Sequence, residues 1–429
     1  MLSEKVTILG MGYVGLTLAV ALAEKGFLVT GVDTNKELVS GLNQAKPHFF
    51  ERDLGRLLRE HLDENLAILT TMPKEPQQAY IVSVGTPIDH EKKPVLTYLE
   101  NSVEQLAGNL HSNPLVVIRS TVPVGTTRRV CKPILDRFKN GGYHLAYCPE
   151  RTAEGDAINE LKFLPQIISG IDEESAEKAA HLFSRLTSTI VRVSSLETAE
   201  LIKLYCNEYR DIHFSIGNEL ARGARALGLD PLEVIRSCNM GYPRSNIAIP
   251  GPVGGACLSK DPYIIISSLE KAGYDPKLLR YTRELNEQQP RIIVKNVHAR
   301  LEQLGVGKNA KLFLTGIAFK GDPETNDTRG SPSLDFLAAL KEHGYTNVYG
   351  HDFVVSQKEI EELGAPYLSL QEGFRDASCV IVANNNRKYQ NLEIENLLAT
   401  MKKPALLTDV WGMFNRKYVE KRSVAYEGF

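Results

Sequence analysis

The chain has 429 residues, with 50 basic and 52 acidic side chains and a formal net charge of −2 at pH 7. This length exceeds what one hydrophobic core usually supports, so we expect two or three domains. The near-neutral charge provides no general attraction for nucleic acid or an anionic membrane, so any anionic ligand must be bound by a local site.

The N-terminal residues and the cysteines indicate a cytoplasmic protein. The sequence MLSEKVTILGMGYVGL carries an acidic residue early and runs straight into a strand, unlike a signal peptide. No apolar stretch approaches the roughly 20 residues that cross a bilayer. The six cysteines form no CxxC pair and no metal-ligand spacing, so we expect reduced thiols and no metal site.

The first part of the chain alternates short apolar runs with helix-like stretches. The apolar runs are KVTILG, FLVTGVD, AYIVSVG, LVVIRS and YHLAYC, and helical stretches cover residues 13–25 and 98–110. This alternation predicts a parallel sheet covered on both faces. We therefore expect a doubly wound domain over residues 1–195.

Long helical segments replace the strands from Leu196 onward. The stretch LETAELIKLYCNEYRDIHFSIGNELARGARALG predicts an unusually long helix that ends at a glycine, and further helices are expected over residues 261–272 and 276–304. Residues 196–308 are thus predicted to form a helical central domain. Such a domain could provide a dimerisation surface or a buried spine.

The alternation of strands and helices returns at Ala310 with AKLFLTG, TNVYGHD, CVIVAN and ALLTDV. Residues 309–429 are expected to form another α/β domain. The predicted fold class is therefore α/β, with two Rossmann-like doubly wound domains joined by a long central helix and a helical middle domain.

A glycine-rich loop directly follows the first predicted strand. Gly10, Gly12 and Gly15 in ILGMGYVGL have the spacing GxGxxG, which permits a tight turn and close approach of backbone N–H groups to a pyrophosphate. Asp33 ends the next strand, where a carboxylate can bond the ribose hydroxyls and repel a 2′-phosphate. The pattern favours NAD over NADP; a Rossmann-like fold that binds a methyl donor is the alternative.

Polar residues also follow three further predicted strands. They are Gly85, Thr86 and Pro87 in VGTPI, Ser120 and Thr121 in IRSTVPVGTT, and Glu150, Arg151 and Glu154 in CPERTAEG. Ligands of open α/β sheets lie at the carboxyl ends of the strands, so these residues are candidates for the ligand crevice. Structural turns, a helix cap or a solvated loop would give the same pattern.

Two more candidate groups lie in the helical middle. Glu200, Lys203 and Asn207 share one face of the long helix, where the lysine and asparagine could both donate to an oxygen that becomes anionic. A solvated polar stripe would have the same spacing. In GPVGGACLSKDPY, Cys257 lies in a glycine-rich turn and is either a nucleophile or an ordinary packed thiol.

Taken in order, GMGYVGL, VGTP, STVPVGTT, PE followed by EG, ELIKLYCNE, GGACLSKDPY and GIAFKGDPETNDTRGSP resemble the UDP-glucose/GDP-mannose dehydrogenase family along nearly the whole chain. The resemblance implies that NAD oxidises the C6 hydroxyl of a UDP-sugar twice, to a uronic acid that feeds surface polysaccharides. It also implies a homodimer or a larger homo-oligomer.

The resemblance further implies roles for individual residues. Cys257 would capture the aldehyde as a thiohemiacetal, which a second hydride transfer converts to a thioester. Lys203 and Asn207 would stabilise the oxyanion. Asp261 and Thr121 would position water or assist proton transfer, and Glu150 would be the general base for thioester hydrolysis.

The implied binding residues form two groups. Cofactor contacts are expected from Gly10, Gly12, Tyr13, Val14, Gly15, Asp33, Gly85, Thr86, Pro87, Ser120, Thr121 and Lys260. Substrate contacts are expected from Glu150, Arg151, Glu154, Lys203, Asn207, Tyr242, Arg244, Asn246, Gly254, Phe319, Lys320 and Arg329. Lysine and arginine side chains would offset the diphosphate charge locally.

The chain departs from the family pattern in places. PGPVGGAC is one residue shorter than the usual loop, which puts Gly251 in doubt as a ligand contact but not Cys257. CPERTAEG, VGGAC and the preceding PR-x-N favour a UDP-N-acetylhexosamine such as UDP-GlcNAc or UDP-ManNAc over UDP-glucose, and VANNNRKY lacks a histidine often found there. A two-electron hydroxy-acid dehydrogenase and a non-catalytic nucleotide-sugar sensor are alternatives of other classes.

Overall fold

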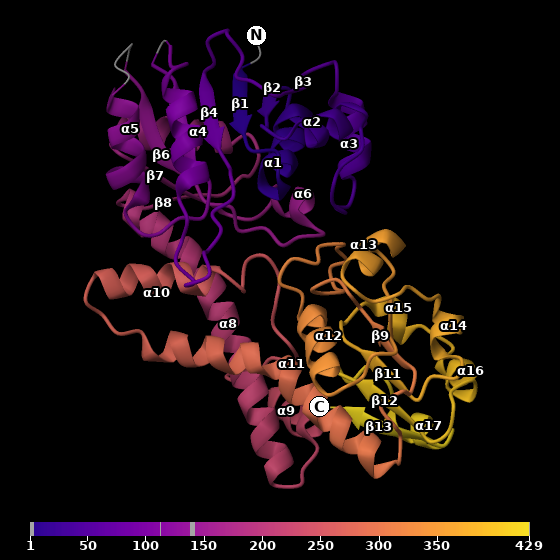
Figure 1. Cartoon of the computed structure of the whole chain (residues 1–429). Coiled ribbons are helices and arrows are strands. Elements are labelled where there is room, and N and C mark those ends of the chain that lie inside the picture. Colours follow the sequence, from indigo (N-terminus) through magenta and orange to yellow (C-terminus); the bar gives the residue numbers. More distant parts are fainter. Residues whose placement is uncertain (1–3, 112, 138–141, 429) are drawn as a thin grey trace. The chain divides into compact units, whose positions relative to one another are not determined.

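The structure, a computed structural model, describes residues 4–111, 113–137 and 142–428. The chain divides into two compact units, one comprising Met1–Asn207 with Lys260–Pro276 and the other Glu208–Ser259 with Lys277–Phe429. Each unit contains one sheet, and the α/β fold class is confirmed (Figure 1). The predicted helical middle, residues 196–308, is divided between the two units, and its status as a separate domain stays a prediction.

Eight strands form the sheet of the first unit, in the order β3-β2-β1-β4-β5-β6-β7-β8. The strands are β1 (Lys5–Leu9), β2 (Leu28–Val32), β3 (Leu66–Leu69), β4 (Ala79–Val82), β5 (Leu115–Ile118), β6 (His144–Tyr147), β7 (Gln166–Gly170) and β8 (Ile190–Arg192). The order of the first six is that of doubly wound dinucleotide-binding sheets, which reverses between β1 and β4. This reversal is where a ligand is expected.

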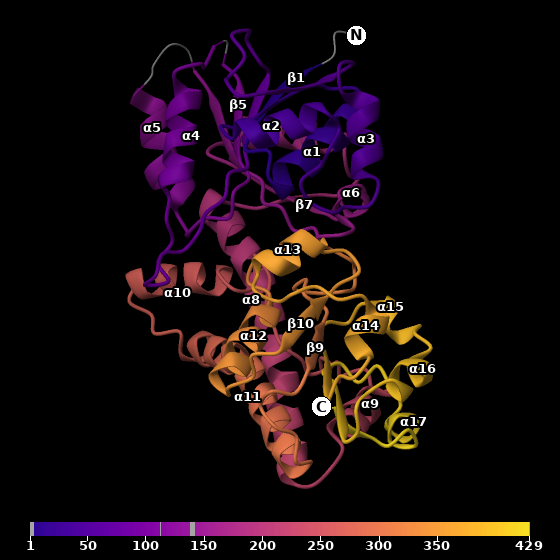
Figure 2. The same cartoon turned by 45° about the vertical axis from the view of Figure 1, so that its right-hand side comes forward.

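Helices cover both faces of this sheet. The helices that lie wholly within this unit are α1 (Tyr13–Glu24), α2 (Lys36–Asn43), α3 (Leu54–His61), α4 (Thr97–Ala107), the π-helix η1 (Thr127–Cys131), α5 (Lys132–Arg137), α6 (Ala157–Glu160), α7 (Glu173–Phe183) and α10 (Asp261–Lys271). Figure 2 shows α4 and α5 side by side on this unit. Alternate residues of β4 enter opposite cores: Ile81 packs with residues of α1, and Tyr80 packs with residues of α4.

The strand β7 differs from the predicted parallel pattern, because it runs antiparallel to β6. Between these strands the chain forms only the four-residue helix α6. A parallel neighbour needs a crossover of a dozen or more residues, usually helical, whereas an antiparallel strand can begin at the edge where β6 ends. The short strands β3, β7, β8 and β13 were not predicted individually.

Five parallel strands form the sheet of the second unit, in the order β10-β9-β11-β12-β13. They are β9 (Leu312–Thr315), β10 (Val348–His351), β11 (Cys379–Val382), β12 (Ala405–Asp409) and β13 (Val424–Gly428). In chain order this is 2-1-3-4-5, the second common doubly wound order, and it reverses between β9 and β11. The segments that follow these two strands are therefore positioned for ligand binding.

The helices of the second unit are α9 (Pro231–Asn239), α11 (Lys277–Gln303), α12 (Pro332–Glu342), α13 (Gln357–Glu362), α14 (Leu370–Phe374), α15 (Arg387–Gln390), α16 (Ile394–Ala399) and α17 (Arg416–Glu420). Leu312 and Leu314 of β9 pack with α11 and α12 on one face of the sheet. Phe313 packs on the other face with Phe374. This arrangement confirms a second Rossmann-like sheet.

The predicted long helix is α8 (Leu196–Ala226), whose 31 residues belong partly to each unit. It ends two residues before Gly228, which has φ +74°. Along one face it carries polar residues at a spacing of three, four, four and seven: Glu200, Lys203, Asn207, Asp211 and Asn218, all of them buried. The predicted face is therefore confirmed as a structural feature, and the alternative of a solvated stripe is wrong.

Candidate active site

A cavity of about 560 Å³ opens where the strand order of the first sheet reverses. Five predicted cofactor residues line it, namely Gly10, Gly12, Asp33, Gly85 and Pro87. The opposite wall comes from α4 and consists of Tyr98, Asn101, Ser102 and Gln105. The α4 residues were missed because their sequence has only ordinary amphipathic periodicity; the neighbouring VGTPI turn was the available signal.

Glycine suits the three positions of the first loop for different structural reasons. Gly10 has φ +90°, a conformation that L side chains rarely adopt. At Gly15 an added Cβ would lie 1.8 Å from the carbonyl oxygen of Gly10, so helix and turn can pack closely only without a side chain. At Gly12 an added Cβ would meet nothing within 4 Å, so the space there is open to a ligand.

The start of α1 offers backbone donors to the same region. This helix begins at Tyr13, and the N–H groups of a first helical turn, including Tyr13 and Val14, have no partner within the helix. The helix dipole adds partial positive charge at this end. The loop and helix start therefore fit the pyrophosphate of a dinucleotide.

Asp33 is held in place at the end of β2. Its carboxylate accepts hydrogen bonds from the backbone N–H groups of Met11 and Asn35, both at 2.9 Å. These bonds fix the carboxylate at the cavity wall while its remaining lone pairs stay available. The position fits a ribose whose hydroxyls donate to Asp33.

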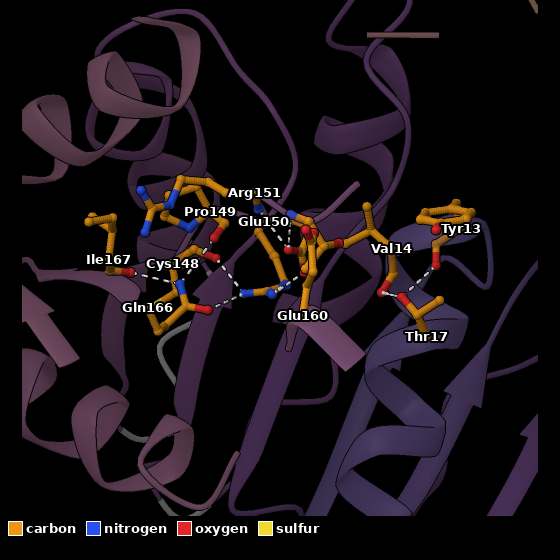
Figure 3. Close-up of polar contacts among 12 residues, drawn as sticks. Tyr13, Val14, Thr17, Cys148, Pro149, Glu150, Arg151, Glu160, Gln166 and Ile167 are labelled. Atoms are coloured by element: carbon orange, nitrogen blue, oxygen red, sulfur yellow. Dashed lines mark hydrogen bonds and ion pairs between the residues drawn. The ribbon is translucent and has the colours of Figure 1, made fainter. Parts of the chain in front are cut away.

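The Tyr13 phenol contacts Glu51 and Gly155, and a cofactor contact from this residue stays a prediction. It donates to the carboxylate of Glu51, and the backbone N–H of Gly155 reaches the phenol oxygen at 3.0 Å. Burial and the neighbouring Glu51 raise the pKa of Tyr13 far above its ordinary value. Figure 3 shows Tyr13 at the start of α1, where its carbonyl and that of Val14 accept hydrogen bonds from Thr17.

The hydroxyl-bearing residues after β4 and β5 differ in their contacts and burial. Ser120 donates to the carbonyl of Val84 at 2.7 Å, which joins the end of β5 to the turn after β4. Thr86 in that turn is buried, and Thr121 is half-buried. Ser120 therefore supports the VGTPI turn that lines the cavity, whereas a contact from Thr86, Ser120 or Thr121 to a ligand stays a prediction.

Glu150 is buried in an ion pair with Arg119, so the alternative of a solvated loop is wrong. The carboxylate accepts from the Arg119 guanidinium and from the backbone N–H groups of Arg151 at 2.6 Å and Thr152 at 2.8 Å. Burial alone would raise the pKa of Glu150, but Arg119 and these N–H groups outweigh it and lower the pKa below 4.5. Glu150 is therefore ionised at neutral pH.

Arg119 and Gln166 extend this pair into a buried polar cluster that sequence reasoning missed. Arg119 donates to the carbonyl of Cys148 at 3.0 Å and to the side chain of Gln166 at 3.1 Å. Gln166 in turn donates to the carbonyls of Pro149 and Ile167, as Figure 3 shows. The position of Arg119 directly before Ser120 at a strand end was the available signal.

The two other candidates of this loop, Arg151 and Glu154, lie nearby in the same segment. Arg151 is half-buried and donates from its guanidinium to the carbonyl of Pro165. Glu154 is half-buried beside Gly155. These contacts stabilise the segment between β6 and β7, and substrate binding by Arg151 or Glu154 stays a prediction.

The polar face of α8 connects to α10 within the first unit. Asn207 donates to the carboxylate of Asp261 at 2.6 Å, and the ammonium of Lys260 lies 2.5 Å from the other oxygen of that carboxylate. Lys203 is buried on the same face. Asn207, Lys260 and Asp261 are thus brought together, and an ammonium and an amide share one buried helix face.

Glu200, on the same face of α8, binds backbone N–H groups of the turn after β5. Its carboxylate accepts from the backbone N–H groups of Gly125 and Thr127, the latter at 2.8 Å. Burial raises the pKa of Glu200 despite these hydrogen bonds. Glu200 therefore holds the STVPVGTT turn that follows β5.

Cys257 lies in an exposed turn of the second unit. The buried thiols of Cys131, Cys148 and Cys379 differ from it, because burial raises the pKa of each to about 12. Such thiols stay protonated at neutral pH and are poor nucleophiles. Exposure thus leaves Cys257 accessible to a reactant, as it does Cys238 on α9.

The cysteine loop packs on the segment that follows β9. The Gly255 N–H donates to the carbonyl of Gly330 at 2.9 Å, and a Cβ on Gly255 would lie 2.5 Å from the Phe319 ring. A Cβ on Gly254 would lie 2.3 Å from the Gly330 carbonyl oxygen. Gly254 and Phe319, both predicted substrate residues, are therefore brought to the loop of Cys257.

The predicted cations of the second unit lie around the same segment. The Lys320 ammonium is 5.5 Å from the centroid of the Phe319 ring. Arg329 is exposed and forms a bidentate ion pair with Asp327, with a shortest distance of 2.6 Å. The Asp327 carboxylate offsets the charge of Arg329 and orients its guanidinium.

Asparagines after β11 support this segment from the other side of the reversal point. Gly316 has φ +85°, and a Cβ there would lie 2.6 Å from Asn384. The Gly321 N–H donates to Asn385 at 2.9 Å, and Asn386 donates to Glu324 at 3.0 Å. The VANNNRKY sequence thus holds the Phe319 segment, which explains why amides suit these positions.

The loop before the cysteine loop is exposed. Arg244 donates to the Tyr242 hydroxyl at 2.9 Å, with its guanidinium carbon 4.7 Å from the centre of that ring. Asn246 is also exposed. The role of Tyr242, Arg244 and Asn246 toward substrate stays a prediction.

The described residues contain neither a membrane-spanning helix nor a cluster of metal ligands. No helix in residues 4–111, 113–137 and 142–428 is long and apolar enough to cross a membrane. No group of three or more His, Cys, Asp or Glu side chains within these same ranges could hold a metal ion.

The sheet order, the cavity at its reversal point and the fixed Asp33 carboxylate define an α/β protein of the dinucleotide-dependent dehydrogenase class. Sequence models of one family match three stretches of the chain. These are the NAD binding domain over residues 4–187, the central domain over 197–288 and the UDP binding domain over 313–416. The chain belongs to the UDP-glucose/GDP-mannose dehydrogenase family, so it is an NAD-dependent nucleotide-sugar dehydrogenase.

Individual relatives agree with this assignment. A UDP-N-acetyl-D-mannosamine dehydrogenase of Methanocaldococcus jannaschii is 32% identical over 438 residues, which cover 100% of this chain and 96% of the relative. The solved structure of a UDP-D-ManNAc dehydrogenase from Pyrococcus horikoshii has a TM-score of 0.88 at 28% identity and covers 99% of both chains. That of a UDP-glucose dehydrogenase from Pyrobaculum islandicum has a TM-score of 0.87 at 26% identity, covering 99% of this chain and 97% of that one.

Proposed function

We propose that the protein oxidises the C6 hydroxyl of a UDP-N-acetylhexosamine to the uronic acid, in two oxidations that share a covalent intermediate on Cys257. The observation that carries this proposal is the position of Cys257. Its exposed loop packs on the Phe319 segment, which follows β9 at the reversal point of the second sheet. Ligands of doubly wound sheets bind at such a point.

The proposed reaction consists of two hydride transfers and one hydrolysis. In the first oxidation, C6 loses a hydride and its hydroxyl loses a proton, which gives an aldehyde. The Cys257 thiolate adds to the aldehyde carbon, and the new C–S bond creates an oxyanion that takes up a proton. Loss of a second hydride and of that proton gives a thioester. Water then breaks the C–S bond, which releases the acid and restores the thiol.

The cofactor cavity supplies the electron acceptor for this sequence. NAD, when bound, accepts one hydride in each oxidation, so two NAD are reduced and one water is consumed per sugar. The turn of Gly10 and Gly12 would hold the pyrophosphate, and Asp33 would accept from the ribose hydroxyls.

The remaining roles go to buried groups of the first unit. Lys203 and Asn207 would donate to the oxyanion from a fixed helix face, where such donors stabilise charge that develops in the transition state. Asp261, bonded to Asn207 at 2.6 Å, would position water or carry a proton with Thr121. Glu150 would be the base for thioester hydrolysis, and its ionised state supports that role.

Sequence similarity favours an N-acetylated sugar over UDP-glucose. The 32% identical relative acts on UDP-N-acetyl-D-mannosamine by name, and the CPERTAEG and VGGAC motifs favour the same branch. Fold similarity does not separate the two sugars, because the two solved structures have TM-scores of 0.88 and 0.87. A panel of UDP-ManNAc, UDP-GlcNAc, UDP-GalNAc, UDP-glucose and GDP-mannose, assayed by NADH absorbance, tests the choice.

The decisive experiment compares Cys257→Ala with Cys238→Ala, the matched variant of another exposed cysteine. We expect Cys257→Ala to abolish uronate formation and keep NAD binding, and Cys238→Ala to form two NADH per sugar like the wild type. Uronate formation by Cys257→Ala would contradict the covalent route. One NADH per sugar from the wild type would favour a two-electron dehydrogenase, and sugar binding without NADH would favour a sensor.

We also propose that two copies pair through α8. Opposite its buried polar face, this helix exposes Tyr205, Tyr209, Ile216 and Leu220, with Tyr209 67% exposed. A helix whose apolar face is outward and whose polar face is buried fits a second copy, since a two-fold axis lets the same patch meet itself. Sedimentation of the wild type should give a dimer, and Tyr209→Glu should weaken it; a monomeric wild type would refute the pairing.

We also propose a cytoplasmic location, which the state of the cysteines supports. None of the six cysteines, all of them among the described residues, forms a disulfide, which is the usual state of thiols in a reducing compartment. Cell fractionation with activity assays tests this location.

A further inference from the structure

A buried chain of hydrogen bonds lies beneath the cysteine loop, which we define as residues 251–258. Four polar side chains form this chain, from α8 and α11: Asp211, Asn218, Arg283 and Asn286. All four have relative exposures of 2% or less. We call them the loop clamp, and all of them belong to the second unit together with the loop.

The first end of the loop is held by Asn218. The backbone N–H of Gly251 donates to the Asn218 side-chain oxygen at 2.8 Å, and the Asn218 amide donates back to the Gly251 carbonyl at 3.0 Å. Both backbone groups of one residue are thus satisfied by one side chain. A Cβ on Gly251 would lie 2.7 Å from the Trp411 ring, so the site accepts only glycine.

The second end is held by Arg283. One nitrogen of its guanidinium donates both to the carbonyl of Leu258 at 2.9 Å and to the carboxylate of Asp211 at 2.7 Å. Leu258 directly follows Cys257 in the chain. The carbonyl next to the nucleophile is therefore fixed by a buried cation that has its own carboxylate partner.

Asn286 joins the two ends. It donates to the Asp211 carboxylate at 2.9 Å, and it accepts from the Asn218 amide at 3.1 Å. The hydrogen bonds therefore run without a break from Leu258 through Arg283, Asp211, Asn286 and Asn218 to Gly251. An unbroken run of buried hydrogen bonds restrains the groups at its two ends, because bonds of this kind are stronger in the interior than in water.

We propose that the loop clamp positions Cys257 for catalysis, with Asn218 and Arg283 as positioning residues; this inference rests on the proposed role of Cys257. The loop has no ladder or helix to fix it, and Gly254 and Gly255 make its backbone flexible in the unfolded state. Tying both ends reduces the positions available to the thiol. Reactive atoms must be held within about 0.5 Å for efficient reaction, so a loosened loop lowers kcat.

The clamp also accounts for Gly251 in the shortened loop. Gly251 stood in doubt as a contact for substrate, and its N–H and carbonyl are both used by Asn218. The residue therefore anchors the loop.

The test uses the full-length enzyme and the variants Asn218→Ala and Arg283→Lys, with Arg291→Gln as the matched control. Arg291 lies on the same helix, but it is exposed and pairs with Glu342. We expect Asn218→Ala to lower kcat at least tenfold, with KM for NAD changed less than threefold. Arg283→Lys, which keeps the charge and a donor, should recover part of the activity lost in Arg283→Gln, and Arg291→Gln should behave like the wild type.

Two readouts on the loop are independent of turnover. Hydrogen exchange of the amides in residues 251–258 should accelerate at least tenfold in Asn218→Ala. Alkylation of Cys257 by iodoacetamide, followed by peptide mass spectrometry over pH 6 to 9, should change in rate or midpoint, while Cys238 in the same sample reacts as in the wild type.

Each outcome has a defined meaning. Unchanged loop exchange together with unchanged kcat in Asn218→Ala would overturn the proposal, as would equal acceleration of Cys257 and Cys238, which indicates general loosening. If Cys257→Ala still forms uronate, the covalent function fails, whereas faster loop exchange in Asn218→Ala would still establish the clamp as the anchor of the loop.

Discussion

The guanidinium of Arg119 donates to the carboxylate of Glu150, and both groups are buried. Removing one partner from such a pair leaves the other charge without compensation in the interior. The pair therefore makes the stability of the first unit depend on Glu150, whatever its role in catalysis.

We expect Glu150→Gln to lower the free energy of unfolding by about 3–5 kcal/mol at pH 7, the usual cost of breaking a buried pair. The pKa of Glu150 is lowered below 4.5 in the folded state, so its contribution is complete above pH 4.5 and is lost as pH falls below that value. The difference between variant and wild type should thus shrink toward pH 3. Urea unfolding monitored at both pH values measures it.

Glu60→Gln is the control for this measurement, because Glu60 forms an exposed pair with Arg56 at 2.8 Å. Solvent screens an exposed pair, so it contributes little to stability and this variant should be nearly neutral. An equal loss in both variants would contradict the special cost of the buried pair.

Alanine substitutions of Gly12 and Gly15 should differ in their effects on stability and NAD binding. In Gly12→Ala the added Cβ meets no protein atom within 4 Å, and alanine accepts the backbone conformation, whose φ is −70°. The Cβ would, however, project at the cofactor cavity, which Gly12 lines. We expect the melting temperature of this variant to match the wild type and its NAD affinity to fall about tenfold or more, equivalent to about 1.4 kcal/mol.

In Gly15→Ala the Cβ would lie 1.8 Å from the Gly10 carbonyl oxygen, so the helix must move away from the turn. We expect a lower melting temperature as well as lost NAD binding. Thermal unfolding and fluorescence titration with NAD separate the two variants, and identical behaviour would contradict the assignment of the open space to the ligand.

Asp33→Asn should change cofactor preference. The amide oxygen can still accept from Met11, but the negative charge that disfavours a 2′-phosphate is gone. We expect weaker NAD binding and a ratio of NADP to NAD affinity that rises about tenfold, measured by titration with both cofactors. Asp89→Asn is the control, since Asp89 also accepts from two backbone N–H groups but lies outside the cavity lining.

Glu208 should make stability fall as pH rises. Burial and the nearby Asp211 raise the pKa of Glu208 from 4.5 to about 7, against the opposing effect of Arg283. The folded state therefore holds a proton that the unfolded chain has lost, so the free energy of unfolding drops between about pH 4.5 and 7.

In Glu208→Gln this decrease should be smaller by about 2–3 kcal/mol between pH 5 and pH 8, because a shift of one pKa unit corresponds to 1.36 kcal/mol. The exposed Glu219 on the same helix provides the control Glu219→Gln, which should follow the wild type. Parallel pH profiles for wild type and Glu208→Gln would refute the raised pKa.

The elements with regular periodicity could be predicted from the sequence, because buried parallel strands and long helices impose their pattern on every residue. The helices near residues 196–226, 261–271 and 277–303 and the GxGxxG turn belong to this group. The antiparallel orientation of β7 relative to β6 could not be predicted, because it depends on the connection before β7 and on which strand lies beside it.

The candidate site could be predicted where a functional residue directly follows a strand. It could be predicted less well where a side chain depends on a partner that is distant in sequence. Asp33 and the glycines lie where the motif indicated. Arg119 pairs with a carboxylate 31 residues away, and Asn218 with a backbone 33 residues away. Only folding brings such groups together, as it does the Tyr13 phenol and Glu51, which are 38 residues apart.

The polar face of α8 restricts how this chain can change in length. Each residue of an α-helix turns by about 100°, so one residue inserted between Asp211 and Asn218 would rotate these two side chains onto different faces. Asn218 could then no longer hold Gly251 while Asp211 pairs with Arg283, even if no residue type had changed. Surface loops can gain or lose residues, but this stretch of helix tolerates substitutions far better than insertions or deletions.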